Sequence, residues 1–342
     1  MPDQLVLQAT RPPPTVSVII PTYNRASFLV DTIKSVLAQT YKHVEIVLVD
    51  DGSTDDTRII LHPYMDRITY IYQENRGRSA ARNTGIGTCS GKYLVFLDSD
   101  DLLLPEKLKR QVSFLESHPE VDLVYSDGYT LNDDGSLDSL EPHVTTFPPP
   151  DRTDLVAAFL RGNLFAPHTA LLRRGCLDAE SLFDESIAGL EDWDLWLRLL
   201  LRGATFAYQD GKVVLYRRHG GNTDVVDPDT FVRARVTTVA KIVRQDLDRH
   251  LPKRIRQDFR LYHLGALART RSPKVIGSAL RTILWPQAKL SLYGLVALPY
   301  RSLLLSIRVA LKATKTASRN SRTASAERSR SPHRHSQELS SR

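Results

Sequence analysis

The chain has 342 residues, of which 42% are hydrophobic and 25% are charged, and its formal net charge is +7. This length and apolar content are enough for a sizeable core, which excludes a wholly disordered chain. The two cysteines, Cys89 and Cys176, exclude a disulfide framework and have no metal-ligand spacing, so we expect a reducing compartment.

Charge is unevenly distributed along the chain. Residues 1–230 carry 34 acidic and 22 basic side chains, whereas residues 231–312 carry 3 acidic and 17 basic ones. An acidic front and a basic back indicate two tasks, which are metal-assisted chemistry in the first part and attachment to an anionic surface in the second.

The front of the chain predicts an α/β domain. Residues 1–14 form an extension without a long apolar run, so we expect no signal peptide and a cytoplasmic location. From residue 15 on, strand-like and helix-like stretches alternate, which is typical of a mostly parallel, doubly wound sheet. The predicted strands are 16–20, 44–49, 68–72, 93–97 and 121–125, and the predicted helices are about 27–39, 54–61, 78–88 and 105–118.

A second half is expected to complete this domain, which we place at residues 15–230. Residues 133–152 contain Gly135 and three consecutive prolines and are predicted to be an exposed loop. Beyond it we expect strands near 169–173 and 213–216, with an amphipathic helix over 189–200 whose first turn is acidic.

The back of the chain has a different character. Residues 231–312 are predicted to form a basic, amphipathic helical appendage, and residues 313–342 a disordered Ser/Arg-rich tail. The longest run without a charge in 275–311 is eleven residues, which is too short to span a bilayer. We therefore expect peripheral contact with an anionic membrane at its cytoplasmic face, and a helical subdomain packed on the core is the alternative.

The most informative run is a predicted buried strand that ends in Asp98, Ser99, Asp100 and Asp101. Carboxylates this close repel one another unless a cation lies between them, and oxygen ligands at a strand end suit Mg²⁺ or Mn²⁺. The alternative is a solvated turn that caps the helix opened by Pro105. Polar residues also follow three other predicted strands, and the carboxyl ends of parallel strands share one edge of the sheet, where ligands bind.

These motifs, taken in order, resemble those of the family 2 glycosyltransferases, whose fold is of the GT-A type. The resemblance covers about residues 15–225 and rests on five segments, which are residues 16–25, 49–55, 75–83 with its Asn-Arg-Gly and Ala-Arg-Asn, 98–100, and 191–192. It implies an inverting transfer of a sugar from a nucleotide diphosphate sugar to an acceptor hydroxyl. The expected context is polysaccharide, lipopolysaccharide or glycolipid synthesis, with a carbohydrate or lipid-linked acceptor.

For the donor nucleotide, the resemblance implies that Tyr23 stacks on the base and that Asp51 accepts the imide proton of uracil, which favours a UDP-sugar. A half-buried turn aromatic and a helix N-cap are the alternatives for these two residues. Arg82 is expected to face the nucleotide or its phosphates, and its alternative is a surface arginine paired with an acid. The other residues expected to bind the donor are Pro21, Thr22, Arg25, Asp98 and Ser99.

For the chemistry, Asp98-Ser99-Asp100 is similar to the family's DXD signature. Asp100 is expected to ligate Mg²⁺ or Mn²⁺ with Asp98 beside it, while a helix N-cap is the expectation for Asp101. His219 resembles a late motif that reaches the metal or diphosphate from a loop. Asp192 resembles the general base and Glu191 is expected to position it or the acceptor.

Two other classes of function compete with this interpretation. A sugar nucleotidyltransferase would need a Gly-rich basic phosphate loop near the first strand, and the sequence has none. A non-enzymatic binder of nucleic acid or of an anionic surface could use the basic back, but the acidic front would repel a phosphate backbone. No nucleic acid partner is therefore expected.

Overall fold

The computed structural model describes residues 15–140, 152–160, 162–178, 182–187 and 189–220, together with residue 238. All of them belong to the first of two units into which the chain divides, Met1–Leu251 and Pro252–Arg342. The predictions for residues 1–14, for the membrane-binding region 231–312 and for the tail 313–342 lie outside the described residues, apart from Thr238.

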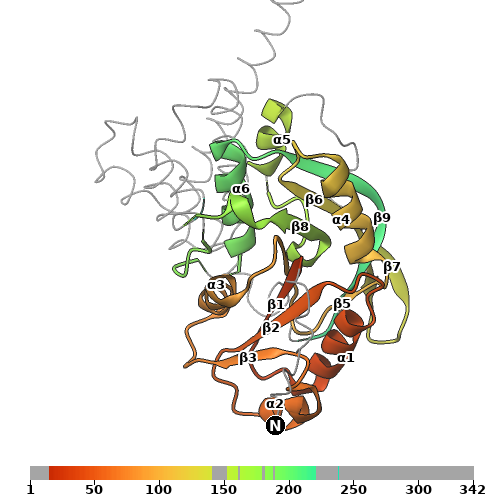
Figure 1. Ribbon diagram of the computed structural model, residues 1–342, viewed down its shortest axis with the longest axis vertical. Coiled ribbons are helices and arrows are strands. Elements are labelled where there is room, and N and C mark those ends of the chain that lie inside the picture. The colour runs from red at the N-terminus through yellow and green to blue at the C-terminus, as the bar shows by residue number, and fades with distance from the viewer. Residues whose placement is uncertain are drawn as a thin grey trace, which may run out of the picture. The chain divides into compact units, whose positions relative to one another are not determined.

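The first half of the domain is a parallel βαβ array (Figure 1). Its strands are β1 (Val16–Thr22), β2 (Val44–Asp50), β3 (Thr69–Tyr72) and β4 (Tyr93–Phe96), and its helices are α1 (Ala26–Leu37), α2 (Thr57–Leu61) and α3 (Arg78–Thr88). Strand β1 lies between β2 and β4 and runs parallel to both. All seven residues of β1 are buried, as expected of a central strand covered on both faces.

The second half extends the same sheet with antiparallel pairs. It comprises β5 (Leu102–Leu103), α4 (Lys107–Ser117), β6 (Leu123–Leu131), β7 (Leu137–Leu140), α5 (Arg152–Phe159), β8 (Ala170–Arg173), α6 (Glu191–Arg202) and β9 (Phe206–Arg217). The strand order is β3-β2-β1-β4-β8-β6-β9-β5, with β7 paired to β6, and β8 runs antiparallel to β4 and β6. The predicted α/β class is confirmed, and the sheet is mixed, since β6 runs antiparallel to β8 and parallel to β9.

The prediction of a loop over residues 133–152 was wrong for residues 137–140, because these form β7 and close a hairpin on β6. Gly135 has a φ of 82° and its N–H donates to the carbonyl of Asn132. An Asn-Asp-Asp-Gly turn of this kind between two strands is a hairpin signal, so the sequence contained the information.

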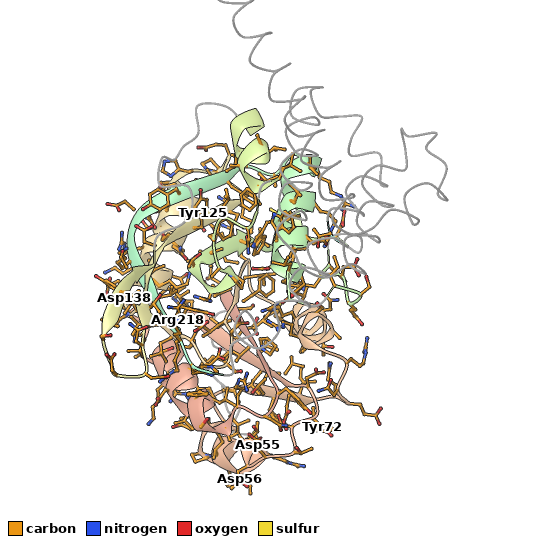
Figure 2. The ribbon with its side chains drawn as sticks, turned by 180° about the vertical axis from the view of Figure 1, so that it is seen from behind. Asp55, Asp56, Tyr72, Tyr125, Asp138 and Arg218 are labelled. Atoms are coloured by element: carbon orange, nitrogen blue, oxygen red, sulfur yellow. The ribbon has the colours of Figure 1, made fainter. Side chains whose placement is uncertain are left out.

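The fold places the polar motifs at one edge, as predicted. Thr22, the last residue of β1, pairs with Asp50, the last residue of β2. Asp98 lies two residues after the end of β4, on the other side of β1. Figure 2 shows that Asp55, Asp56 and Tyr72 belong to the β2–β3 end of the domain, whereas Tyr125 lies in the second half. Among the described helices, none combines the length and the apolar character that crossing a bilayer requires.

The position of α3 against the sheet depends on Gly85. A Cβ at this position would lie 2.5 Å from Cγ2 of Ile19, which is fully buried on β1. Glycine therefore lets the helix approach the strand closely, and Arg82, one turn earlier on α3, is carried toward the end of β4.

This packing gives the first prediction. Gly85→Ala should lower the free energy of unfolding by about 1–3 kcal/mol through overpacking against Ile19. Gly87→Ala in the same helix is the matched control, since a Cβ there meets nothing within 4 Å, and it should raise stability by up to about 1 kcal/mol. Urea unfolding followed by circular dichroism measures both, and equal effects of the two substitutions would contradict the close approach.

Candidate functional site

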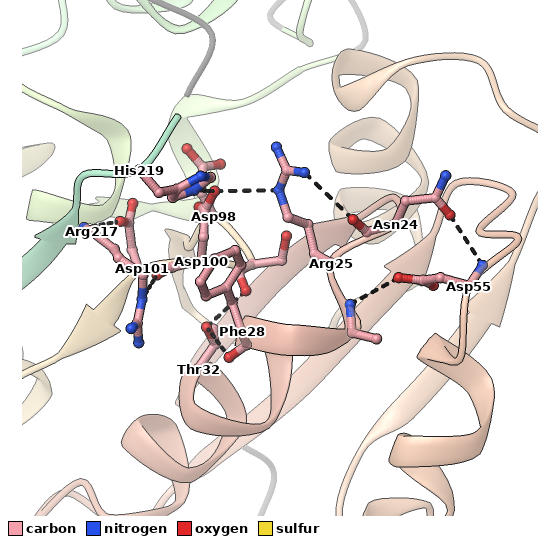
Figure 3. Close-up of polar contacts among 12 residues, drawn as sticks. Asn24, Arg25, Phe28, Thr32, Asp55, Asp98, Asp100, Asp101, Arg217 and His219 are labelled. Atoms are coloured by element: carbon pink, nitrogen blue, oxygen red, sulfur yellow. Dashed lines mark hydrogen bonds and ion pairs between the residues drawn. The ribbon is translucent and has the colours of Figure 1, made fainter. Parts of the chain in front are cut away.

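The loops after β1 and β2 are joined into one wall by Asn24, which has a φ of 51°. Its Oδ1 accepts from the N–H of Thr54 at 2.8 Å and that of Asp55 at 3.3 Å. In return, Oδ2 of Asp55 accepts from the N–H of Ala26 at 3.1 Å, at the first residue of α1 (Figure 3). These bonds cross between the two loops and hold them in register.

The residues of this wall that are expected to bind the donor nucleotide differ in their exposure to solvent. Tyr23 is 47% exposed, so a face of its ring is available for stacking, whereas Pro21 and Thr22 are buried at the end of β1. The buried carboxylate of Asp51 accepts from the side chain of Gln73 and from the N–H groups of Arg76 and Gly77, at 2.7, 3.0 and 2.7 Å. Asp51 therefore orders the loop before α3, and the alternative of an N-cap for α2 was wrong.

At the end of β4, Asp100 lies among basic groups. Its Oδ2 is 3.0 Å from Nε2 of His219 and 3.5 Å from Nε of Arg25 (Figure 3). The ring of His219 stacks on Phe28 of α1 with 4.7 Å between centroids, which fixes the loop after β9 against this cluster. The predicted metal residues Asp100 and His219 are thus brought together across 119 positions of sequence. Ser99 is buried, and its carbonyl accepts from Oγ1 of Thr32 at 2.9 Å.

A second set of possible metal ligands includes two residues that are more deeply buried than Asp100 and His219. Asp98, Asp101 and His168 each offer one ligand atom, and the three atoms lie within 4.8 Å of one another. Nδ1 of His168 is 3.0 Å from Oδ2 of Asp101, yet within the described residues neither ring nitrogen has a hydrogen-bond partner. Burial lowers the pKa of His168 to about 4, so the ring is neutral at physiological pH, which is the form that binds a metal.

The expectation for Asp101 was wrong. Asp101 is fully buried and its Oδ1 accepts from the N–H of Arg217 at 2.8 Å, whereas α4 begins at Lys107 with Glu106 as its N-cap. Burial, with the carboxylates of Asp100 and Asp98, raises the pKa of Asp101 well above its ordinary value. A cation at this point would relieve that repulsion.

Arg82 joins the end of β4 to the start of α6. Its guanidinium donates to Oδ1 of Asp98 and to Oε1 of Glu191, both at 2.6 Å, and the side chain is 1% exposed. Burial opposes ionisation of both acids, but Arg82 outweighs it and keeps the pKa of Asp98 and of Glu191 below the ordinary values. The alternative of a surface arginine was wrong, and contact with the donor's phosphates stays a prediction.

Asp192 and Glu191 have different surroundings although they are neighbours at the start of α6. Glu191 is buried against Arg82 and accepts from the N–H of Gly189 at 2.9 Å. Asp192 is half-buried and accepts from the N–H of Trp193 at 2.8 Å and from Nδ2 of Asn163 at 2.7 Å. Burial and the charge of Glu191 raise the pKa of Asp192 to about 6. Such a carboxylate is ionised at neutral pH and still basic enough to take a proton.

The structure therefore gathers the predicted residues into three adjoining groups. The first is the wall that carries Tyr23 and Asp51, the second is the acid cluster at the end of β4, and the third is the Glu191–Asp192 pair. Sequence reasoning missed His168 and Asn163. Asn163 lies in an irregular segment and His168 in a short 3-10 helix, Pro167–Thr169, both before β8. Neither belongs to a sequence motif that could have indicated its role.

Part of the chain is similar to known proteins. Residues 17–179 match the model of a family described as Glycosyl transferase family 2. An uncharacterised glycosyltransferase of Rickettsia typhi is 36% identical over 60% of this chain and 64% of its own length. Chondroitin synthase of Escherichia coli is 31% identical over 62% of this chain and 30% of its own length. The matched part thus spans about two thirds of the Rickettsia relative and about a third of the synthase.

Two solved structures share the fold. S. aureus TarS in complex with UDP-GlcNAc has a TM-score of 0.58 at 19% identity, over 79% of this chain and 81% of that chain. Mannosyltransferase PcManGT from Pyrobaculum calidifontis, in complex with GDP-Man and Mn²⁺, has a TM-score of 0.51 at 18% identity, over 88% and 86% of the two chains.

The Arg82 bridge gives the second prediction. Arg82→Met should lower the free energy of unfolding by about 3–5 kcal/mol, because it leaves the buried Glu191 without its closest cation. Arg202→Met is the control, since Arg202 pairs with Asp178 at 3.1 Å on the surface, with side chains 40% and 68% exposed, and it should cost less than about 1 kcal/mol. Chemical denaturation compares them. A loss for Arg82→Met as small as that of the control would show that the bridge contributes little.

Proposed function

Residues 17–179 of this chain belong to glycosyl transferase family 2, and on this premise we propose that the protein transfers a sugar from a nucleotide diphosphate sugar to an acceptor hydroxyl with inversion. One observation carries the proposal. A half-buried carboxylate with a pKa of about 6, Asp192, lies beside Glu191, which Arg82 ties to the acid cluster at the end of β4. Arg82 thus connects a possible proton acceptor to a cluster that is suited to binding a diphosphate.

We infer that the donor is a UDP-sugar that binds along the wall of the β1 and β2 loops. The exposed ring of Tyr23 offers a stacking surface for the base. A carboxylate has about four acceptor positions, of which Asp51 uses three, so one is left for the imide N–H of uracil. TarS, which shares the fold, binds UDP-GlcNAc, whereas the mannosyltransferase binds GDP-Man. The chemistry of Asp51 decides our choice of uracil.

The carboxylate and imidazole groups at the end of β4 are suitable ligands for a hard divalent cation, Mg²⁺ or Mn²⁺. We propose that Asp100 and His219 hold it with Asp98 beside them, because a diphosphate arrives from the solvent side. The side chains of Asp100 and His219 are 15% and 11% exposed, while those of Asp101 and His168 are each 1% exposed. When bound, such a cation neutralises the charge that develops on the leaving diphosphate. Arg25 lies within 3.5 Å of Asp100 and can contribute charge at the same place.

The residues of α6 supply the proton acceptor. As the acceptor oxygen attacks the anomeric carbon and the bond from that carbon to the diphosphate oxygen breaks, the hydroxyl proton passes to Asp192. The nucleoside diphosphate leaves with the bonding electrons, and attack from the opposite face inverts the configuration. Glu191 remains ionised through Arg82, so it holds the start of α6 and does not compete for the proton.

We propose that the acceptor belongs to polysaccharide synthesis, which chondroitin synthase supports by name. Two further proposals rest on the charge of the sequence. They are a lipid-linked or membrane-presented acceptor, and attachment of residues 231–312 to an anionic membrane at its cytoplasmic face. Liposome sedimentation of the full chain at low and high salt tests that attachment.

The third prediction concerns Asp192. Asp192→Asn should reduce transfer about 10²-fold to 10⁴-fold with donor affinity unchanged, because only the proton acceptor is lost. In the native protein the rate should fall as the pH drops through about 6, where Asp192 gains a proton. Single-turnover rates and calorimetric binding of UDP separate the two effects. Asp178→Asn, on an exposed residue, is the control, and parallel loss of UDP affinity in Asp192→Asn would assign Asp192 to donor binding.

The fourth prediction separates the two candidate ligand sets. Loss of a group that only hydrogen-bonds to a metal ligand weakens metal binding about 10-fold to 100-fold. His219→Gln removes a proposed ligand itself, so it should weaken Mn²⁺ binding in the presence of UDP by at least that factor. Asp100→Ala should abolish transfer. His168→Gln should retain Mn²⁺ affinity. Electron paramagnetic resonance of added Mn²⁺ measures free against bound ion, and the reverse pattern for the two histidines would place the ion at the inner set.

A further inference from the structure

Asn163 makes a contact with the start of α6 that the proposed reaction does not yet use. Its Nδ2 donates to Oδ2 of Asp192 at 2.7 Å, from the irregular segment between α5 and β8. We propose that Asn163 is a positioning residue that holds the carboxylate of Asp192 in the orientation in which it receives the acceptor's proton. This inference rests on the proposed function, in which Asp192 is the base.

The segment that carries Asn163 is firmly held. Leu164 and Phe165, the next two residues, are each 5% exposed, and the ring of Phe165 stacks on Tyr125 of β6 with 4.3 Å between centroids. Immediately after Asp192, Nε1 of Trp193 donates to the carbonyl of Phe159 at 2.7 Å. Two consecutive residues of α6 are therefore hydrogen-bonded to this part of the chain, Asp192 to Asn163 and Trp193 to Phe159.

The two hydrogen bonds to Asp192 come from different directions. Oδ1 accepts from the N–H of Trp193 within its own helix, and Oδ2 accepts from Asn163 across the interface. One bond alone would leave the carboxylate free to turn about its last side-chain torsion, which is broad and roughly two-fold. The second bond, from outside the helix, restricts that rotation.

The oxygen of the same amide supports the view that position 163 holds an asparagine because of its hydrogen bond to Asp192. Within the described residues, Oδ1 of Asn163 is buried and has no hydrogen-bond partner. An unsatisfied buried acceptor is destabilising, so an amide kept only for the fold would be expected to satisfy both ends. Turning the amide over would direct its oxygen at the carboxylate of Asp192, which fixes the orientation.

A neutral donor also suits the chemistry of a base. Of the charged groups that face Asp192, Glu191 on its own helix raises its pKa and Arg82 on α3 lowers it, while Arg78 lies 3.6 Å from Glu191. A lysine or arginine in place of Asn163 would hold the carboxylate in position but would stabilise its charge and weaken its affinity for the proton. An amide orients Asp192 with a smaller loss of basicity.

The test compares Asn163→Ala with the double variant Asn163→Ala/Asp192→Asn in the full chain, with UDP-GlcNAc and a panel of other UDP-sugars as probes. We expect Asn163→Ala to lower the single-turnover rate about 10-fold. The acid limb of the rate should move up by about one pH unit, because a donor to the ionised form is lost. The double variant should be no slower than Asp192→Asn alone, since a residue that acts through Asp192 has nothing left to position.

Three controls keep the result interpretable. Asn132→Ala removes a bond of the same kind, from an asparagine amide to Asp138 at 2.8 Å in the β6–β7 hairpin, and should leave the rate and its pH profile unchanged. Asn163→Asp, which keeps the shape, should also move the acid limb upward, because two carboxylates then share a proton. Thermal unfolding shows whether each variant is folded.

The outcomes are distinct. A native pH profile in folded Asn163→Ala, or a further loss of rate in the double variant, would overturn the positioning role. A raised KM for the acceptor with an unchanged pH profile would make Asn163 an acceptor contact and likewise overturn it. If Asp192→Asn itself transfers sugar at the native rate, the proposed function fails, and this result is separate from the other two.

Discussion

The site depends on a single buried cation, the guanidinium of Arg82. Without it, the buried negative charge of Glu191 would lose the cation at hydrogen-bonding distance from it, and such a charge is tolerated only when it is paired and hydrogen-bonded. Arg82 pairs with Glu191 and with the partly exposed Asp98, both at 2.6 Å, and so ties the end of β4 to the start of α6. The spacing between the acid cluster at the end of β4 and the Glu191–Asp192 pair follows from this constraint.

The same constraint gives neighbouring carboxylates different roles. Glu191 faces Arg82 and its pKa is lowered, whereas Asp192, one residue later, faces the amide of Asn163 and its pKa is raised to about 6. Ionisation is thus favoured for Glu191 and opposed for Asp192. Asp100 and Asp101 also have different surroundings, since Asp100 lies close to His219 and Arg25 and Asp101 is buried beside His168.

Much of the first half of the fold could be predicted because its signals are local. Continuous apolar runs such as that of β1 are typical of buried parallel strands, and the polar residues that follow them mark the edge where ligands bind. The second half was harder. Residues 137–140 were predicted to be a loop although they pair with β6, and Asp101 was expected to cap a helix although it lies buried before β5. For Asp101 the outcome depends on Arg217, which is distant in sequence. The β6–β7 hairpin, by contrast, carries a local turn signal that the loop prediction did not use.

By itself the sequence determined which chemical groups follow the parallel strands and at which edge of the sheet they emerge, since motif, strand and strand end are contiguous in the chain. Only the tertiary structure decided which groups pair. Arg82 meets Glu191 across 109 positions, Asp100 meets His219 across 119, and Asn163 meets Asp192 through an interface between α6 and the segment after α5. Such pairs form because burial leaves each polar group with few possible partners, and packing selects among them.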